Sequence, residues 1–258
     1  MINASSIERR ALAAFAVISL AAAFFPSDVF AQTQLPGYFD EISGRIIIEA
    51  ESIGSLPSRW EDQVSTNAPN IKDPGLATGD GFIVWDGSQQ LNNPGNGLMV
   101  YPIRINTPGE YRFCWRSQVG SGNSATEHND SWLKIESSEF FGRNGSGGIV
   151  CPKGLTAAEN ACTGNAPNGS GRDGWFKVYS SGTTSWTFST RTSDNDAHNI
   201  FAQFDAAGLY AIKVSARSSF HLLDRFTLSK SGDCETDLGL SESVFVDIEL
   251  IFDDRFES

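Results

Sequence analysis

Two glutamates spaced two residues apart are the strongest chemical signal in the sequence. Glu49 and Glu51 end the segment 46–51, Ile-Ile-Ile-Glu-Ala-Glu. In a β-strand, residues i and i+2 share a face, so both carboxylates would point away from Ile46 and Ile48. Adjacent carboxylates repel each other unless a cation lies between them, and hard oxygen donors suit calcium. Taken alone, the pair is more simply explained by two ordinary surface acids on a solvated edge strand.

Six tryptophans could supply flat surfaces on which the rings of a sugar stack. Strand parity places Trp85, Trp115 and Trp186 in the core. The candidates for stacking platforms are Trp60 in a polar loop, Trp132 on the face of Lys134, and Trp175 directly after a long loop. The alternative for each of these three is that the ring covers the edge of the fold beneath a loop.

Two polar residues, Asn129 and Asp130, come just before the Trp132 strand and could bond sugar hydroxyls. Their alternative role is loop capping, because asparagine and aspartate readily bond nearby backbone.

Catalytic motifs give no positive signal. The sequence has no Gly-x-Ser-x-Gly elbow and no phosphate-binding loop. The three histidines, His128, His198 and His221, lack metal-ligand spacing, as do the cysteines. Paired carboxylates for glycoside cleavage depend on three-dimensional separation, so the sequence leaves them open. We therefore expect a protein without catalytic residues.

The charge distribution argues against two classes of partner. The formal net charge is −12, and residues 232–258 contain nine acids against one base, Arg255. An acidic chain without a basic patch is poorly suited to nucleic acid or anionic lipid.

The N-terminus has the pattern of a secretory signal peptide. Arg9 and Arg10 precede the apolar run 11–25, and small residues at Val29 and Ala31 favour cleavage after residue 31. The alternative is an uncleaved anchor, but the run is short for a membrane span. We expect a secreted or cell-surface protein of bacterial export, with no span after the signal is removed.

Four cysteines in an exported chain predict two disulfides. Three pairings are possible. Cys151 and Cys162 share one loop, so we favour that pair, which leaves Cys114 with Cys234. The second bond would attach the acidic tail, 232–258, to the body, 32–231.

The body has the pattern of an all-β fold, with short apolar or alternating runs separated by Gly, Asn, Pro and Ser. Segment 142–174 is a long loop in which only 156–161 suggests a helical turn. About ten strands indicate a β-sandwich. The expected strands are 45–51, 81–85, 98–105, 110–117, 132–135, 175–179, 185–189, 200–204, 208–216 and 220–229.

Two segments carry a family resemblance. Glu49-Ala50-Glu51 and Phe220-His221-Leu222-Leu223-Asp224-Arg225-Phe226-Thr227-Leu228 resemble the first and last strands of carbohydrate-binding modules of the galactose-binding-like jelly-roll class, families six and thirty-five and malectin-like relatives. The resemblance covers roughly 44–230. It implies a jelly-roll β-sandwich, a structural Ca²⁺ held by Glu49, Glu51 and Asp224, and binding of a glycan or polysaccharide.

The end of the chain has a resemblance of its own. Residues 251–257 resemble an acidic-aromatic ending, Ile-Phe-x-Asp-Gly-Phe-Glu, found on exported proteins of certain proteobacteria, with Arg255 in place of the glycine. The alternative is a final strand docked on the body, because residues from Val244 to Glu249 alternate.

These observations predict a monomeric, exported, non-catalytic glycan-binding protein. Two other functions stay open: a structural or adhesive surface protein, and an unrecognised polysaccharide lyase or hydrolase. Release of reducing sugar would favour the enzyme, whereas a folded protein that binds no glycan would favour the structural role.

Overall fold

A computed structural model describes residues 36–63, 76–154, 162, 166–167, 171–180, 182–192, 197–234 and 236–248. The predicted signal peptide, the expected turn at 156–161 and the ending 251–257 lie outside this part of the chain. Within it, no helix is long and apolar enough to cross a membrane.

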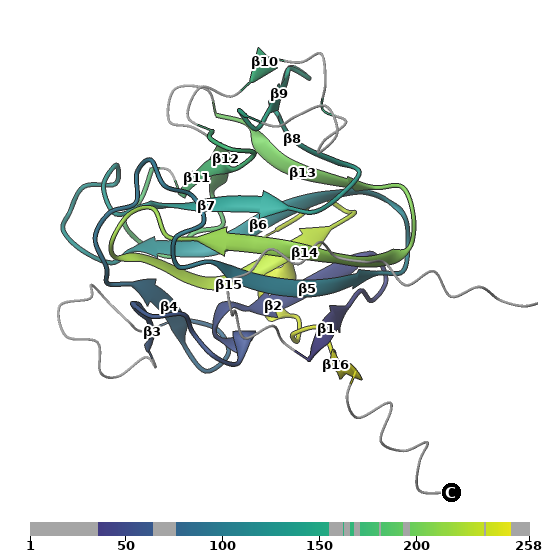
Figure 1. The fold of residues 1–258 in the computed structure, drawn as a ribbon, viewed down its shortest axis with the longest axis horizontal. Coiled ribbons are helices and arrows are strands. Elements are labelled where there is room, and N and C mark those ends of the chain that lie inside the picture. The colour runs from purple at the N-terminus through teal and green to yellow at the C-terminus, as the bar shows by residue number, and fades with distance from the viewer. Residues whose placement is uncertain are drawn as a thin grey trace, which may run out of the picture. The chain divides into compact units, whose positions relative to one another are not determined.

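One sheet has seven strands, and its order can be followed in Figure 1. From edge to edge its strands are β12 (Thr190–Thr192), β11 (Phe176–Ser180), β7 (Asp130–Ile135), β14 (Gly208–Ser215), β5 (Met99–Ile105), β1 (Gly37–Asp40) and β16 (Phe245–Asp247).

The other sheet has nine strands. Its main path is β10 (Ala166–Pro167), β9 (Ile149–Cys151), β8 (Glu139–Arg143), β13 (Asn199–Phe204), β6 (Gly109–Val119), β15 (His221–Ser229), β4 (Phe82–Trp85) and β3 (Trp60–Gln63). The ninth strand, β2 (Arg45–Glu49), pairs with β15 beside β4. Two 3₁₀ turns complete the described elements, η1 (Ala50–Ile53) and η2 (Thr236–Gly239).

The core lies where alternate residues of the two sheets meet. On β6, Tyr111, Phe113 and Trp115 are fully buried, and on β14 Ile212 and Val214 are too. This period of two is what a half-buried strand requires. The predicted all-β, jelly-roll β-sandwich is confirmed.

Several short strands and one loop depart from the expected pattern. The strands β1, β3, β8, β9, β10 and β12 have no counterpart among the expected strands, and β16 was anticipated only as the alternative to a sorting ending. The expected strand 185–189 is instead a loop, which pairs with β6 through a bridge between Thr187 and Ser117. Serine and threonine dominate this loop, so its alternation carries little apolar signal.

Both predicted disulfides are present. Cys151 is bonded to Cys162 and Cys114 to Cys234, with Cα–Cα distances of 5.7 and 6.0 Å.

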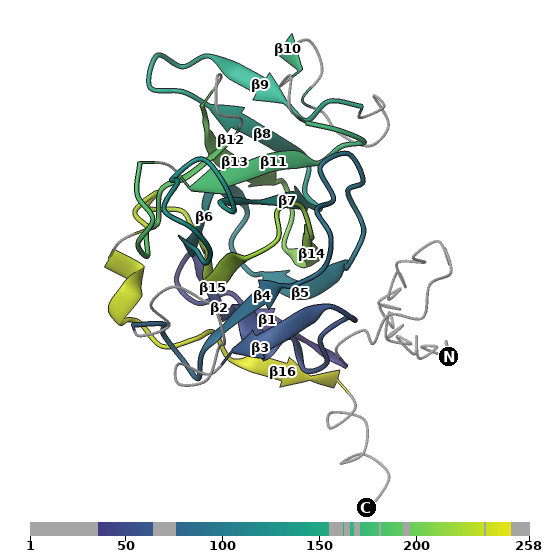
Figure 2. The same cartoon turned by 90° about the vertical axis from the view of Figure 1, so that its left-hand side faces the viewer.

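The described residues after Cys234, 236–248, are part of the sandwich rather than a free tail. Ser243 exchanges two hydrogen bonds with the outer edge of Ile47 in β2. The chain then forms β16, which pairs antiparallel with β1 (Figure 2). Residues 236–248, here called the C-terminal segment, therefore connect the edges of both sheets, and the docked-strand alternative holds for 245–247.

Candidate functional site: a carboxylate cluster at a β-bulge

Asp224 lies where β15 exchanges one neighbouring strand for another. Leu222 and Leu223 pair with β4, whereas Arg225–Ser229 pair with β2. The register with β6 shifts between Leu223 and Arg225, so Asp224 is the extra residue of a β-bulge. A bulge interrupts the strict alternation of a strand and re-aims side chains. Asp224 thereby lies at the point where the neighbour of β15 changes from β4 to β2.

Glu49 and Glu51 stand on different elements. The sequence suggested one strand through residue 51, but β2 ends at Glu49 and η1 begins at Ala50. Ala50 and Ile53 are both buried, and their spacing of three fits the 3₁₀ turn rather than a strand. The i, i+2 argument for a shared face therefore does not apply.

The segment before β4 nevertheless joins all three acids. The Thr78 hydroxyl lies 2.8 Å from Glu49 Oε2 and 3.1 Å from Asp224 Oδ1. The Thr78 amide donates to Asp224 Oδ1 at 2.8 Å. Glu51 Oε1 accepts the backbone N–H groups of residues 80–81, both at 3.0 Å. Thr78 and its neighbours thus connect the carboxylates to one another.

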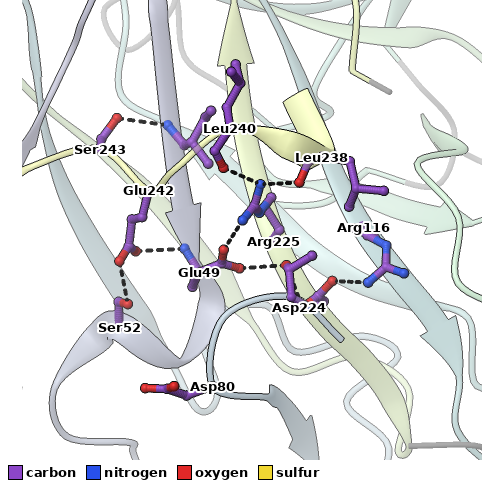
Figure 3. A network of polar contacts seen from close by, with 12 residues as sticks. Glu49, Ser52, Asp80, Arg116, Asp224, Arg225, Leu238, Leu240, Glu242 and Ser243 are labelled. Atoms are coloured by element: carbon purple, nitrogen blue, oxygen red, sulfur yellow. Dashed lines mark hydrogen bonds and ion pairs between the residues drawn. The ribbon is translucent and has the colours of Figure 1, made fainter. Parts of the chain in front are cut away.

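Two arginines offset two of the three negative charges. Arg116 forms an ion pair with Asp224, and Arg225 with Glu49 (Figure 3). Glu51 gains no such pair, and burial, together with the charge of Glu49, raises its pKa to about 8. Burial also raises the pKa of Asp224 to about 6, against the opposing effect of Arg116. The cluster therefore retains an uncompensated acid.

The donor set and one unsatisfied atom fit a calcium ion. All the nearby donors are oxygens, as Ca²⁺ prefers. Glu51 Oε2 is buried without a hydrogen-bond partner. Gly79 closes over the acids so tightly that a Cβ there would lie 2.7 Å from Glu51 Oε1. Among the described residues, no three Asp, Glu, His or Cys side chains are arranged to coordinate a metal ion. Binding of a cation would therefore require the carboxylates to turn toward one another.

The three predicted platforms are buried. Trp60, Trp132 and Trp175 are 4%, 1% and 8% exposed. The indole N–H of Trp60 donates to the Gly97 carbonyl at 2.7 Å, and that of Trp132 to the Gln90 carbonyl at 2.9 Å. The prediction that these rings are available for stacking is therefore wrong.

The reason is that strand parity identifies a face but not what covers it. Trp132 does share a face with charged residues, since its register partner on β11 is Lys177. Arg217 then lies over the Trp132 ring, 5.1 Å from its centre. The one tryptophan that stays partly exposed is Trp186, which parity assigned to the core and the structure places in a loop.

Asn129 and Asp130 also face inward, at 2% and 4% exposure. The Asn129 amide donates to the carbonyls of Ala125 and Ser180, at 3.1 and 2.9 Å. Asp130 forms an ion pair with Arg217 and accepts the hydroxyl of Ser218. The alternative prediction, that these side chains hold the loops together, describes them correctly.

His221 gives the fold a pH dependence. It is fully buried, its Nδ1 lies 2.9 Å from Ser131 Oγ, and its Nε2 has no hydrogen-bond partner. Burial lowers its pKa from 6.5 to about 4. Between these two pH values the unfolded chain is protonated at His221 and the folded protein is not. The contribution of His221 to stability is therefore complete above pH 6.5 and is lost as the pH falls toward 4.

We expect His221→Gln to reduce this acid sensitivity. Between pH 7 and pH 5 the wild-type protein should lose about 2 kcal/mol more unfolding free energy than the variant. Urea unfolding of both proteins at the two pH values measures the difference. Equal losses would show that His221 does not carry the effect.

The comparisons with known proteins identify no relative by sequence. No family model matches the chain, and no curated protein matches it. Among solved structures, a GH26-CBM35 β-(1,4)-mannanase of Podospora anserina is 13% identical over 73% of this chain and 28% of its own, with a TM-score of 0.40. An isomalto-dextranase of Arthrobacter globiformis T6, complexed with panose, is 12% identical over 73% of this chain and 24% of its own, with a TM-score of 0.35. The chain thus spans about a quarter of either protein, and its function has to be argued from its own residues.

Proposed function

We propose that this is an exported, non-catalytic glycan-binding protein whose β-sandwich is stabilised by one calcium ion at the carboxylate cluster. The observation that carries the proposal is the meeting of Glu49, Glu51 and Asp224. Two of these acids are near the start of the domain and the third is near its end, yet all three contact residues 78–81. These are the positions that the jelly-roll resemblance assigns to a structural calcium.

The two disulfides support the exported location in this proposal. Two disulfides suit an oxidising, extracellular environment. Single glycan sites of this kind bind weakly and act by avidity on polymers or beside a separate catalytic protein. No catalytic role is proposed for the carboxylates, because Glu49 and Asp224 are each paired with an arginine.

The test is a glycan and polysaccharide array probed with purified protein, in calcium and in chelator. We expect binding to a related set of glycans, weaker in chelator because the metal-free cluster holds an uncompensated acid. A reducing-sugar assay on the bound polysaccharides should show no release. Released sugar would overturn the non-catalytic assignment.

A structural or adhesive surface protein is the second candidate. The burial of Trp60, Trp132 and Trp175 favours it, because a scaffold needs no exposed aromatic platform. An array without any bound glycan, from protein shown to be folded by circular dichroism, would select this function.

A further inference from the structure

Trp186 differs from every other tryptophan of the protein. The remaining five are all less than 9% exposed. Trp186 is partly exposed, in the loop 182–189 outside the nine-stranded sheet, where it packs against the small cluster formed by Phe82, Val84 and Leu222. Trp186 is thus the least buried tryptophan of the protein.

The ring is held in a fixed position. The edge of Trp186 meets Phe82 with ring centres 5.7 Å apart. The guanidinium of Arg116 lies 4.9 Å from the centre of the Trp186 ring, and Arg116 is itself only 8% exposed and ion-paired with Asp224. A ring that is already ordered loses little entropy when a ligand stacks on it.

The loop backbone is fixed as well. Thr187 exchanges two hydrogen bonds with Ser117 of β6, each 3.0 Å long. The Thr190 hydroxyl accepts from the Trp115 amide, at 3.0 Å. Trp186 is therefore presented by a rigid loop, although no regular strand carries it.

Apart from the Arg116 guanidinium against the ring, the loop that carries Trp186 is uncharged and rich in hydroxyls. Residues 182–190, Gly-Thr-Thr-Ser-Trp-Thr-Phe-Ser-Thr, contain no ionisable group, and Ser185 is exposed. An aromatic ring among hydroxyls is suited to the C–H face and the hydroxyls of a pyranose. The net charge of −12 disfavours anionic polymers at the same place.

We propose that Trp186 is the platform on which a neutral glycan stacks, an assignment that rests on the proposed glycan-binding function. Arg116 is then a positioning residue that connects two sites, because it contacts the Trp186 ring and the carboxylate of Asp224.

The test uses affinity gel electrophoresis in a panel of soluble polysaccharides, neutral (galactomannan, xylan, β-glucan) and acidic (pectin, alginate). We expect at least one neutral polymer to retard the wild-type protein and Trp186→Ala to bind it at least tenfold more weakly. The control is Leu209→Ala, which removes an exposed apolar side chain (49% exposed) from β14 in the other sheet and should bind as the wild type does.

Hydroxyl-radical footprinting of the wild-type protein with the retarding polymer avoids any folding defect of the variant. We expect oxidation at Trp186 to fall at least fivefold. Retardation without protection of Trp186, and with Trp186→Ala unaffected, would overturn the platform assignment alone. Retardation only by pectin or alginate would overturn the neutral ligand. A wild-type protein that no polymer retards would overturn the glycan-binding function together with this site.

Discussion

Asp224→Ala should lower the unfolding free energy of the metal-free protein by about 3–5 kcal/mol. Asp224 is fully buried, and its partner Arg116 is 8% exposed, so the substitution leaves a buried guanidinium without its counter-charge. The Thr78 amide loses its acceptor as well. Urea unfolding in chelator measures the loss.

A surface ion pair provides the matched control. Lys213 and Glu136 are paired with side chains 28% and 36% exposed. Because exposed pairs contribute little, Glu136→Ala should cost less than about 1 kcal/mol. Comparable losses in both variants would contradict a special role for the buried pair.

The calcium response separates the two roles of Asp224. In the wild-type protein we expect calcium to raise the melting temperature, because a ligand of the folded state stabilises that state. Asp224→Ala should abolish the shift. Adding Arg116→Met to Asp224→Ala removes the unpaired cation, so stability should return in part while the calcium shift stays absent. A calcium shift that survives Asp224→Ala would remove Asp224 from the metal site.

The disulfide from Cys114 to Cys234 should contribute more stability than the one from Cys151 to Cys162. The first closes a loop of 120 residues and the second a loop of 11. By the loop-entropy relation, these bonds are worth about 5 and about 3 kcal/mol. Both cysteines of each pair are replaced by alanine rather than serine, because serine would introduce a buried hydroxyl.

Urea unfolding of the two double-alanine variants measures the difference, provided that the slope with urea stays constant. Hydrogen exchange should also rise in 236–248 when the longer loop is opened, since Cys234 anchors the start of that segment. An equal or larger loss from the 151–162 pair would contradict the loop-length argument.

The sandwich could be predicted because apolar alternation is visible in single segments. The meeting of Glu49, Glu51 and Asp224 was implied only by the family resemblance, since the shared-face argument for the two glutamates does not hold in the structure. Ile46 and Ile48 enter the core as their spacing requires. The bulge could not be predicted: Leu223 and Phe226 both reach the core, and only the register with β6 shows that Asp224 is the inserted residue. The prediction that three tryptophans are exposed failed for a related reason. Trp132 is covered by Arg217, which is distant in sequence.

The C-terminal segment has a consequence for how the chain folds. Ser243 forms hydrogen bonds with the outer edge of β2, and β16 pairs with the edge of β1. Cys234 forms a disulfide with Cys114. Arg225, which fixes Glu49, also donates to the carbonyls of Leu238 and Leu240 (Figure 3). Such contacts between distant parts of a sequence make folding slow. The sandwich can therefore close only after nearly the whole domain, up to β16, is available to fold.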